Sequence, residues 1–147
     1  MKLSTKGRYG MRAMLDLAQH YEDGLILAKD VARRQGISER YLEHLFLTLK
    51  TAGLIKSVRG AHGGFTLARP PHKIKLMDIL SVSEGQIALV DCVADASVCS
   101  RSSFCATRDL WTELQSVIGG FLRSQTLQDL VGRQKVKEQP SVNLYNI

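Results

Sequence analysis

The chain of 147 residues is long enough for one domain with a hydrophobic core, or for one domain with an appended element. It contains no apolar run near 18 residues and no signal-peptide core, so we expect a soluble, cytosolic protein with no membrane partner. The net charge of +6 is unevenly placed, because residues 1–75 hold 14 basic and 6 acidic side chains (+8) and residues 76–147 hold 6 and 8 (−2). This split predicts a salt-sensitive attraction of the first half to phosphate groups.

Residues 1–22 have the pattern of a helix with a basic start and one apolar stripe. The basic side chains are Lys2, Lys6, Arg8 and Arg12, and the stripe consists of Met11, Met14, Leu15, Ala18 and Tyr21. We expect the stripe to face the core, and the basic start to meet a phosphate or a partner subunit. Asp23 and Gly24 end this helix.

Residues 28–51 have the pattern of two helices joined by a tight turn. The first helix spans residues 28–35, and Gly36 ends it because glycine reaches the left-handed backbone conformation without a Cβ clash. Ser38 is a good N-cap for the second helix. On that helix one apolar stripe recurs at i, i+3, i+4 and i+7, and consists of Leu42, Leu45, Phe46 and Leu49. We therefore expect the stripe to bury the second helix against its neighbours.

The opposite face of the second helix carries polar side chains. They are Arg40, His44 and Thr51, with Glu43 and Thr48 at the borders. This is the arrangement of a recognition helix, whose N-terminal residues meet base edges in the major groove of duplex DNA. Leu47 also projects outward, and a thymine methyl group is the candidate partner for it.

A glycine-rich hairpin follows at once. Residues 54–58 and 65–68 are strand-like, and residues 59–64 join them with three glycines. Such a tip can approach a phosphate backbone or minor groove closely, and Arg59 suits a narrow minor groove. Helix-turn-helix spacing also occurs in ordinary helical bundles, but the hairpin and the basic charge favour DNA binding. We therefore predict a mostly α fold with a winged helix-turn-helix domain over residues 1–85.

Every cysteine of the chain lies in residues 86–105, after a short predicted helix at residues 76–82. Cys92, Cys99 and Cys105 are spaced C-x6-C-x5-C. An odd number of cysteines in a cytosolic protein argues against a disulfide framework, and the spacing is not the paired C-x2-C of a zinc ribbon. The three thiolates could surround one soft metal centre, with Cys105 at a helix N-terminus, or they could be inert thiols. The polar residues around them favour the metal centre over a core strand.

Helical periodicity returns over residues 106–122, with one wide apolar face. Its members are Leu110, Trp111, Leu114, Val117, Ile118, Phe121 and Leu122. A helix of this length, roughly 25 Å, more often pairs with its copy than finds enough core in so small a protein. We expect a homodimer that reads a two-fold-related DNA site, with residues 106–132 as the dimerisation region. Residues 126–131 are predicted to form a last helical turn, and residues 133–147 a polar, poorly ordered tail.

Nearly the whole chain resembles a family of regulators. The resemblance is carried by the opening MKLSTKGRYGMRAMLDLA, by ISERYLEHLFLTLKTAGLIKSVRGAHGGFTLAR, and by three cysteines just before the long helix. These segments are similar to those of the winged-helix iron-sulfur transcription regulators. That group includes the regulator of iron-sulfur cluster assembly, the nitric-oxide-sensing repressor and the rhizobial iron regulator.

The resemblance implies a dimeric DNA-binding regulator, usually a repressor, whose cysteine-bound [2Fe-2S] or [4Fe-4S] cluster tunes its affinity for the operator. By position, the cluster ligands would be Cys92, Cys99 and Cys105. The residues at the major groove would be Ser38, Glu39, Arg40, Tyr41, Glu43 and His44, and those at the wing Arg59, Gly60 and His62. We find no nucleophile with its base, no phosphate loop and no paired carboxylates, so we do not expect an enzyme.

The chain departs from the family pattern at the fourth cluster ligand. Some relatives place a histidine two residues after the third cysteine, where this chain has Thr107. Others use an acidic residue on the first helix of the partner, where this chain has Arg8 and Arg12. The remaining candidates for a fourth ligand are Asp91, Asp95, a partner residue such as Asp16, and an exogenous ligand. Alternatives to a cluster are sensing by thiol oxidation or zinc, and an adaptor whose long helix binds a foreign protein.

Overall fold

The computed structural model describes residues 2–140, which form helices around one two-stranded antiparallel sheet. The first part contains α1 (Thr5–Gln19), η1 (Tyr21–Asp23), α2 (Ala28–Gln35), α3 (Glu39–Thr51), β1 (Ile55–Val58), β2 (Gly64–Leu67), η2 (Pro71–Lys73) and α4 (Leu76–Glu84). The second contains α5 (Asp91–Ala94), η3 (Ala96–Val98), η4 (Ser102–Phe104), α6 (Ala106–Ser124) and α7 (Leu127–Glu138). The mostly α, winged helix-turn-helix fold predicted from the sequence is thereby confirmed. Within residues 2–140, each helix is too short or too polar to cross a lipid bilayer.

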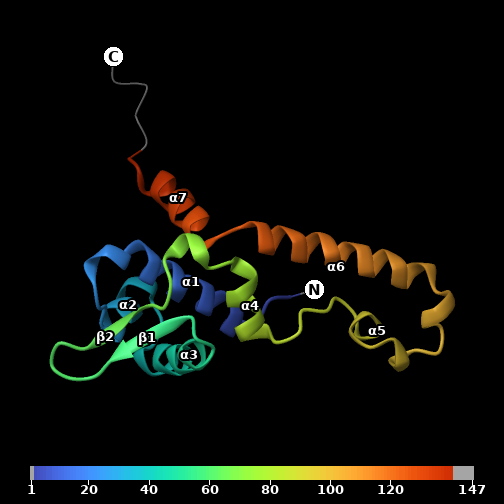
Figure 1. Cartoon of the computed structure of the whole chain (residues 1–147), viewed down its shortest axis with the longest axis horizontal. Coiled ribbons are helices and arrows are strands. Elements are labelled where there is room, and N and C mark those ends of the chain that lie inside the picture. The colour runs from blue at the N-terminus through green and yellow to red at the C-terminus, as the bar shows by residue number, and fades with distance from the viewer. Residues whose placement is uncertain (1, 141–147) are drawn as a thin grey trace, which may run out of the picture.

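The molecule has a compact head, which we define as residues 2–85, and a long arm (Figure 1). Helix α1 lies at the centre of the head and packs against α2, α3, α4 and α7. The chain leaves the head after α4, runs outward through α5, and returns along α6, so the arm has two antiparallel segments (Figure 1). The cysteine segment, residues 86–105, therefore lies between the head and the long helix in sequence and beside that helix in space.

One hydrophobic core fills the head. Its largest fully buried apolar side chains are Met14, Leu17, Val31, Leu42, Phe46, Leu49, Ile55, Ile74, Ile79 and Leu127. Apart from Ile74, which lies just before α4, they come from α1, α2, α3, α4, β1 and α7, so α7 belongs to this core although it follows the arm.

Both predicted capping and turn residues of the helix-turn-helix have the expected conformations. Gly36 has φ 63° and ψ 37°, in the left-handed region, and Ile37 after it is buried. The Ser38 side chain accepts a hydrogen bond of 3.2 Å from the backbone N–H of Tyr41. The predicted stripe of α3 is fully buried, which turns the opposite face of the helix to solvent.

The first helix is shorter than predicted, because Ser4 is its N-cap. The Ser4 hydroxyl accepts a hydrogen bond of 3.0 Å from the Gly7 N–H. The Ser4 backbone N–H in turn donates to the Glu84 carboxylate at 3.0 Å. A Cβ at Gly7 would collide with this carboxylate in its present position, so the glycine leaves room for Glu84 to reach Ser4. Met1 lies outside the described residues.

The wing is attached to the rest of the head by an isolated β-bridge next to β2. Strands β1 and β2 pair from Ile55–Leu67 to Val58–Gly64. Ile26 then pairs with Phe65 on the other side of β2, through backbone hydrogen bonds of 2.8 and 2.7 Å. A Cβ at Gly64 would lie 2.8 Å from the Ile26 carbonyl oxygen. This glycine, predicted as part of the loop that joins the two strands, therefore allows β2 to approach the backbone of Ile26 closely.

The C-terminal helix is longer than the sequence predicted. Instead of one turn over residues 126–131 followed by a disordered tail, α7 continues to Glu138. Thr126 and Asp129 form a capping box at its start, and Leu127 and Val131 are buried in the core of the head. These contacts stabilise the helix that a polar sequence alone does not favour. The remainder of the predicted tail, residues 141–147, lies outside the described residues.

Candidate nucleic-acid interface and cysteine segment

The predicted major-groove residues occupy the exposed start of α3. Ser38, Glu39, Arg40, Glu43 and His44 are exposed. Tyr41 is the exception, because it is half-buried and its ring packs edge-on against that of Tyr9, with the centroids 5.9 Å apart. Tyr41 therefore also joins α3 to α1, a contact between distant segments that periodicity did not reveal.

The wing residues are exposed beside this helix. Arg59, Gly60 and His62 all lie in the loop between β1 and β2 and are exposed to solvent. The wing is held against α3 by a pair of aromatic rings, Phe46 from the helix and Phe65 from β2, whose centroids are 4.6 Å apart. The relative position of helix and wing is thus set by a packed contact.

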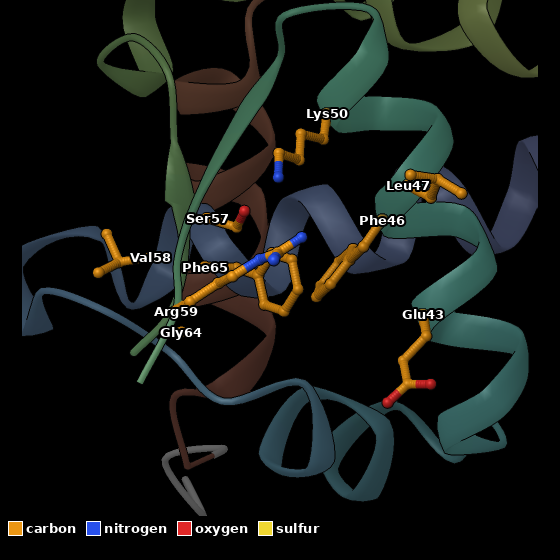
Figure 2. A pocket seen from close by; sticks show the side chains of 9 residues that line it. All are labelled: Glu43, Phe46, Leu47, Lys50, Ser57, Val58, Arg59, Gly64 and Phe65. Carbon is orange, nitrogen blue, oxygen red and sulfur yellow. The ribbon is translucent and has the colours of Figure 1, made fainter. Parts of the chain in front are cut away.

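A groove of about 270 Å³ separates α3 from the wing. It is lined by Glu43, Phe46, Leu47, Lys50, Ser57, Val58, Arg59, Gly64 and Phe65. Figure 2 shows Lys50 reaching in from the helix and Arg59 from the wing, with the Arg59 side chain crossing in front of the Phe65 ring. Two cations facing one groove form a site to which the phosphates of a nucleic acid are attracted. Sequence reasoning identified Arg59 but missed Lys50 and Ser57, which become neighbours only when the wing folds back.

The basic start of α1 has structural contacts of its own. The Arg12 guanidinium lies 5.3 Å from the centre of the Tyr9 ring and donates a hydrogen bond to the Gln35 carbonyl at the end of α2. The Arg8 guanidinium lies 6.0 Å from the same ring and is exposed. Arg12 therefore helps to hold α1 against α2, while Arg8 stays accessible to a phosphate.

A buried ion pair fixes the helix-turn-helix to α1. The Asp16 side chain is 2% exposed, and its carboxylate oxygens lie 2.7 and 3.0 Å from two nitrogens of Arg34. Gln35 Nε2 donates a third hydrogen bond, at 2.9 Å. The bond to Asp16 raises the pKa of Arg34 above its usual value, which keeps the guanidinium charged. Asp16 is thus bound within its own subunit, which removes it from the candidates for a partner's fourth cluster ligand.

The cysteine segment is built from short turns rather than a continuous helix, as the loss of periodicity predicted. Cys92 lies in α5, Cys99 follows η3, and Cys105 is the residue that precedes α6. Two hydrogen bonds fasten the segment to the long helix. Arg108 Nε donates to the Cys92 carbonyl at 2.9 Å, and the Leu89 N–H donates to Gln115 Oε1 at 3.0 Å.

Cys105 has the environment of a reactive thiol. Its sulfur lies 3.1 Å from the Thr107 hydroxyl. This hydrogen bond, together with the backbone N–H groups at the start of α6 and the charge of Arg101, lowers the pKa of the Cys105 thiol. A thiolate is the form that binds metals and attacks oxidants. Thr107, which stands where relatives carry a histidine ligand, therefore contacts the cysteine directly.

The thiols have the right chemistry for an iron centre but are not gathered into a site. Across residues 2–140, no three His, Cys, Asp or Glu side chains form a group that could hold a metal ion. Cys99 is exposed, and Cys92 and Cys105 are half-buried. Of the acidic candidates for a fourth ligand, Asp95 accepts hydrogen bonds from Ser97 and Asp91 is exposed. In the described conformation the three thiols are therefore not gathered around one centre.

The predicted apolar face of α6 is largely uncovered. Five of its side chains are among the exposed large apolar residues of the described chain: Leu110, Trp111, Leu114, Val117 and Phe121. Ile118 and Leu122, the other two members, are half-buried towards the head. A continuous exposed stripe of this size marks a contact surface for another macromolecule.

Comparison with known proteins places the chain in a family. The Rrf2 model, described as iron-dependent transcriptional regulators, matches residues 3–133. The chain belongs to the Rrf2 family. Members of the Rrf2 family are DNA-binding transcriptional regulators rather than enzymes, as the sequence indicated.

Individual Rrf2 relatives are similar to this protein over most of its length. It is 40% identical over 138 residues to the transcriptional regulator IscR of Photobacterium profundum, covering 94% of this chain and 80% of the relative. The solved structure of T. potens IscR is 41% identical with a TM-score of 0.78, over 95% of this chain and 93% of that one. CymR, the global cysteine regulator of B. subtilis, is 39% identical with a TM-score of 0.78, over 90% and 98%. The recognised resemblance to the iron-sulfur regulators is therefore confirmed at the level of the family.

Proposed function

We propose that this Rrf2 protein is a cytoplasmic, homodimeric repressor in which Cys92, Cys99 and Cys105 bind an iron-sulfur cluster, [2Fe-2S] or [4Fe-4S]. The observation that carries the proposal is the position of the cysteines. All three lie on the segment that joins the head to α6 and that is bonded to α6 at Arg108 and Gln115. A cluster held by these three thiolates would supply an iron centre able to respond to iron supply, redox state or nitric oxide. The description of the family as iron-dependent supports this assignment.

The DNA-binding surface in this proposal is the outer face of α3 and the wing. Ser38, Glu39, Arg40, Tyr41, Glu43 and His44 would lie in the major groove, and Arg59, Gly60 and His62 would hold the wing against the backbone or minor groove. Exposure of all but Tyr41, and the cations on both sides of the groove, support this placement. A dimer would present two such surfaces to a two-fold-related operator.

Regulation in this proposal requires the cysteine segment to change shape. The thiols are not gathered in the described conformation, so bringing them onto one centre must move residues 91–105. A ligand shifts a conformational equilibrium only by binding one state better than the other. Because the segment is bonded to α6, such a movement would alter how the long helices of the dimer hold the two heads.

Anaerobic purification tests the cluster. We expect a coloured protein with visible absorption bands, iron and acid-labile sulfide, all lost in the triple Cys92, Cys99 and Cys105 to alanine variant. Cys99→Ala alone should change operator affinity or its dependence on iron, whereas Ser103→Ala, at an exposed position in the same segment, should leave that dependence intact. A colourless protein without iron or sulfide after reconstitution, or identical binding curves for Cys99→Ala and wild type, would overturn the cluster switch.

A cluster-free regulator that senses by thiol oxidation, zinc or a protein partner is the second candidate. The observation that favours it is the lowered pKa of Cys105 in a segment whose thiols stay apart. Reversible mass increases on oxidation, or bound zinc without sulfide, would identify this mode in the purification experiment.

Arg59 tests the wing. Arg59→Ala should weaken operator binding and reduce the slope of log affinity against log salt by about 1, because one phosphate contact is lost. The matched control is Arg133→Ala, which removes an exposed arginine from α7 and should change neither quantity. Fluorescence anisotropy at several salt concentrations measures both, and an unchanged slope for Arg59→Ala would exclude the wing from the interface.

A further inference from the structure

Leu47 is an exposed apolar side chain on the outer face of α3. Its side chain is 61% exposed although it lies in the middle of a well-packed helix. At about 100° per residue, it projects almost opposite the buried stripe of α3. Its neighbours one turn away are Glu43 and Thr51, both exposed and polar. A single apolar side chain thus stands at the centre of the face that would meet DNA.

Leu47 does not contribute to the hydrophobic core, so packing in the core does not explain why an apolar residue stands here. It lines the groove between helix and wing together with Lys50 and Arg59. Figure 2 shows its side chain pointing away from the ring of Phe46, on the outside of the helix. Leu47 shares this groove with a second exposed apolar side chain, Val58, which is 51% exposed. Two side chains of this size offer too little apolar area for a protein partner, whose interfaces bury about 800 Å² on each side.

We propose that Leu47 is a specificity residue that contacts the 5-methyl group of a thymine in the major groove. Among the four bases, only thymine presents a methyl group there, and apolar side chains read it by direct contact. A leucine gains nothing from a phosphate, whereas Lys50 and Arg59 beside it do. The inference rests on the proposed placement of α3 in the major groove, and it adds one base that this helix would select.

The test uses deoxyuridine, which differs from thymidine by this methyl group alone. The full-length wild-type protein first selects its preferred duplex from a random library. Each thymine of that duplex is then replaced by deoxyuridine, and the dissociation constant is measured at fixed salt. We expect one thymine position, present once in each half-site, at which the wild-type protein loses about fourfold in affinity for each methyl group removed. Leu47→Ala should bind the thymine duplex more weakly and be indifferent to the replacement at that position.

Val136→Ala is the matched control, because Val136 is a 68% exposed apolar residue on α7, away from the groove. This variant should keep the wild-type sensitivity to deoxyuridine. The inference is overturned if wild type binds its selected duplex tightly and Leu47→Ala shows the same loss at every replaced thymine. If no duplex is enriched at low salt, the DNA-binding placement of α3 fails first, so the two failures are distinguishable.

Discussion

Phe46→Ala is expected to lower the free energy of unfolding by about 3 to 5 kcal/mol, the range for removing a large buried aromatic side chain. Phe46 is 0% exposed and its ring packs against Phe65 of the wing. The variant loses apolar burial and leaves a cavity where α3 meets β2. Urea unfolding followed by circular dichroism measures the change.

The neighbouring residue provides the control for Phe46. Leu47→Ala truncates a side chain of similar character that is exposed, so its unfolding free energy should stay within about 0.5 kcal/mol of wild type. Equal destabilisation by the two variants would mean that α3 does not bury the face described here. Because Leu47→Ala keeps the fold, any loss of operator affinity in that variant is a loss of contact with DNA.

Val117→Glu is expected to convert the proposed dimer into monomers and to reduce operator affinity by about 100-fold or more. Val117 is 68% exposed on the apolar face of α6, and a dimer would surround it with the partner's apolar side chains. A carboxylate buried there without a partner is strongly unfavourable. Two linked heads gain affinity from binding together, by a factor of 10² to 10⁴ in typical bivalent systems, and a monomer loses this gain.

Sedimentation velocity and anisotropy titration together test the dimer. Ser116→Glu is the matched control, since it adds the same charge to an exposed position on the polar side of α6 and should preserve the dimer. A Val117→Glu variant that sediments as wild type would show that this face is not the interface between subunits. The exposed stripe would then need a foreign partner, as in the adaptor hypothesis.

The helix-turn-helix is the part of the molecule that local sequence determines. The i, i+3, i+4, i+7 spacing on α3, the turn at Gly36 and the cap at Ser38 all act within a few residues of one another. Each therefore has a local physical cause that can be read without the fold. The same holds for the apolar face of α6. Its residues recur with the helical period, and α6 is one continuous helix over Ala106–Ser124.

Tertiary structure decided the contacts between segments that are distant in sequence. Asp16 could have been a surface carboxylate or a ligand until Arg34 was placed over it, 18 positions along the chain. The length of α7 depends on burial of Leu127 and Val131 in a core made by the first 85 residues, and Gly64 is needed because Ile26 pairs with the wing.

The cysteine segment shows the same division. Its sequence determines which residues can bind a soft metal, because spacing and chemistry are local properties. Whether the thiols meet depends on how the segment lies against α6. In this conformation Arg108 and Gln115 bond the segment to that helix, and its three thiols are not gathered into one group. Sequence alone therefore determined the recognition helix and the candidate cluster ligands. Only the tertiary structure decided how these residues are arranged in space, because side chains far apart in the chain must pack together before contacts between them exist.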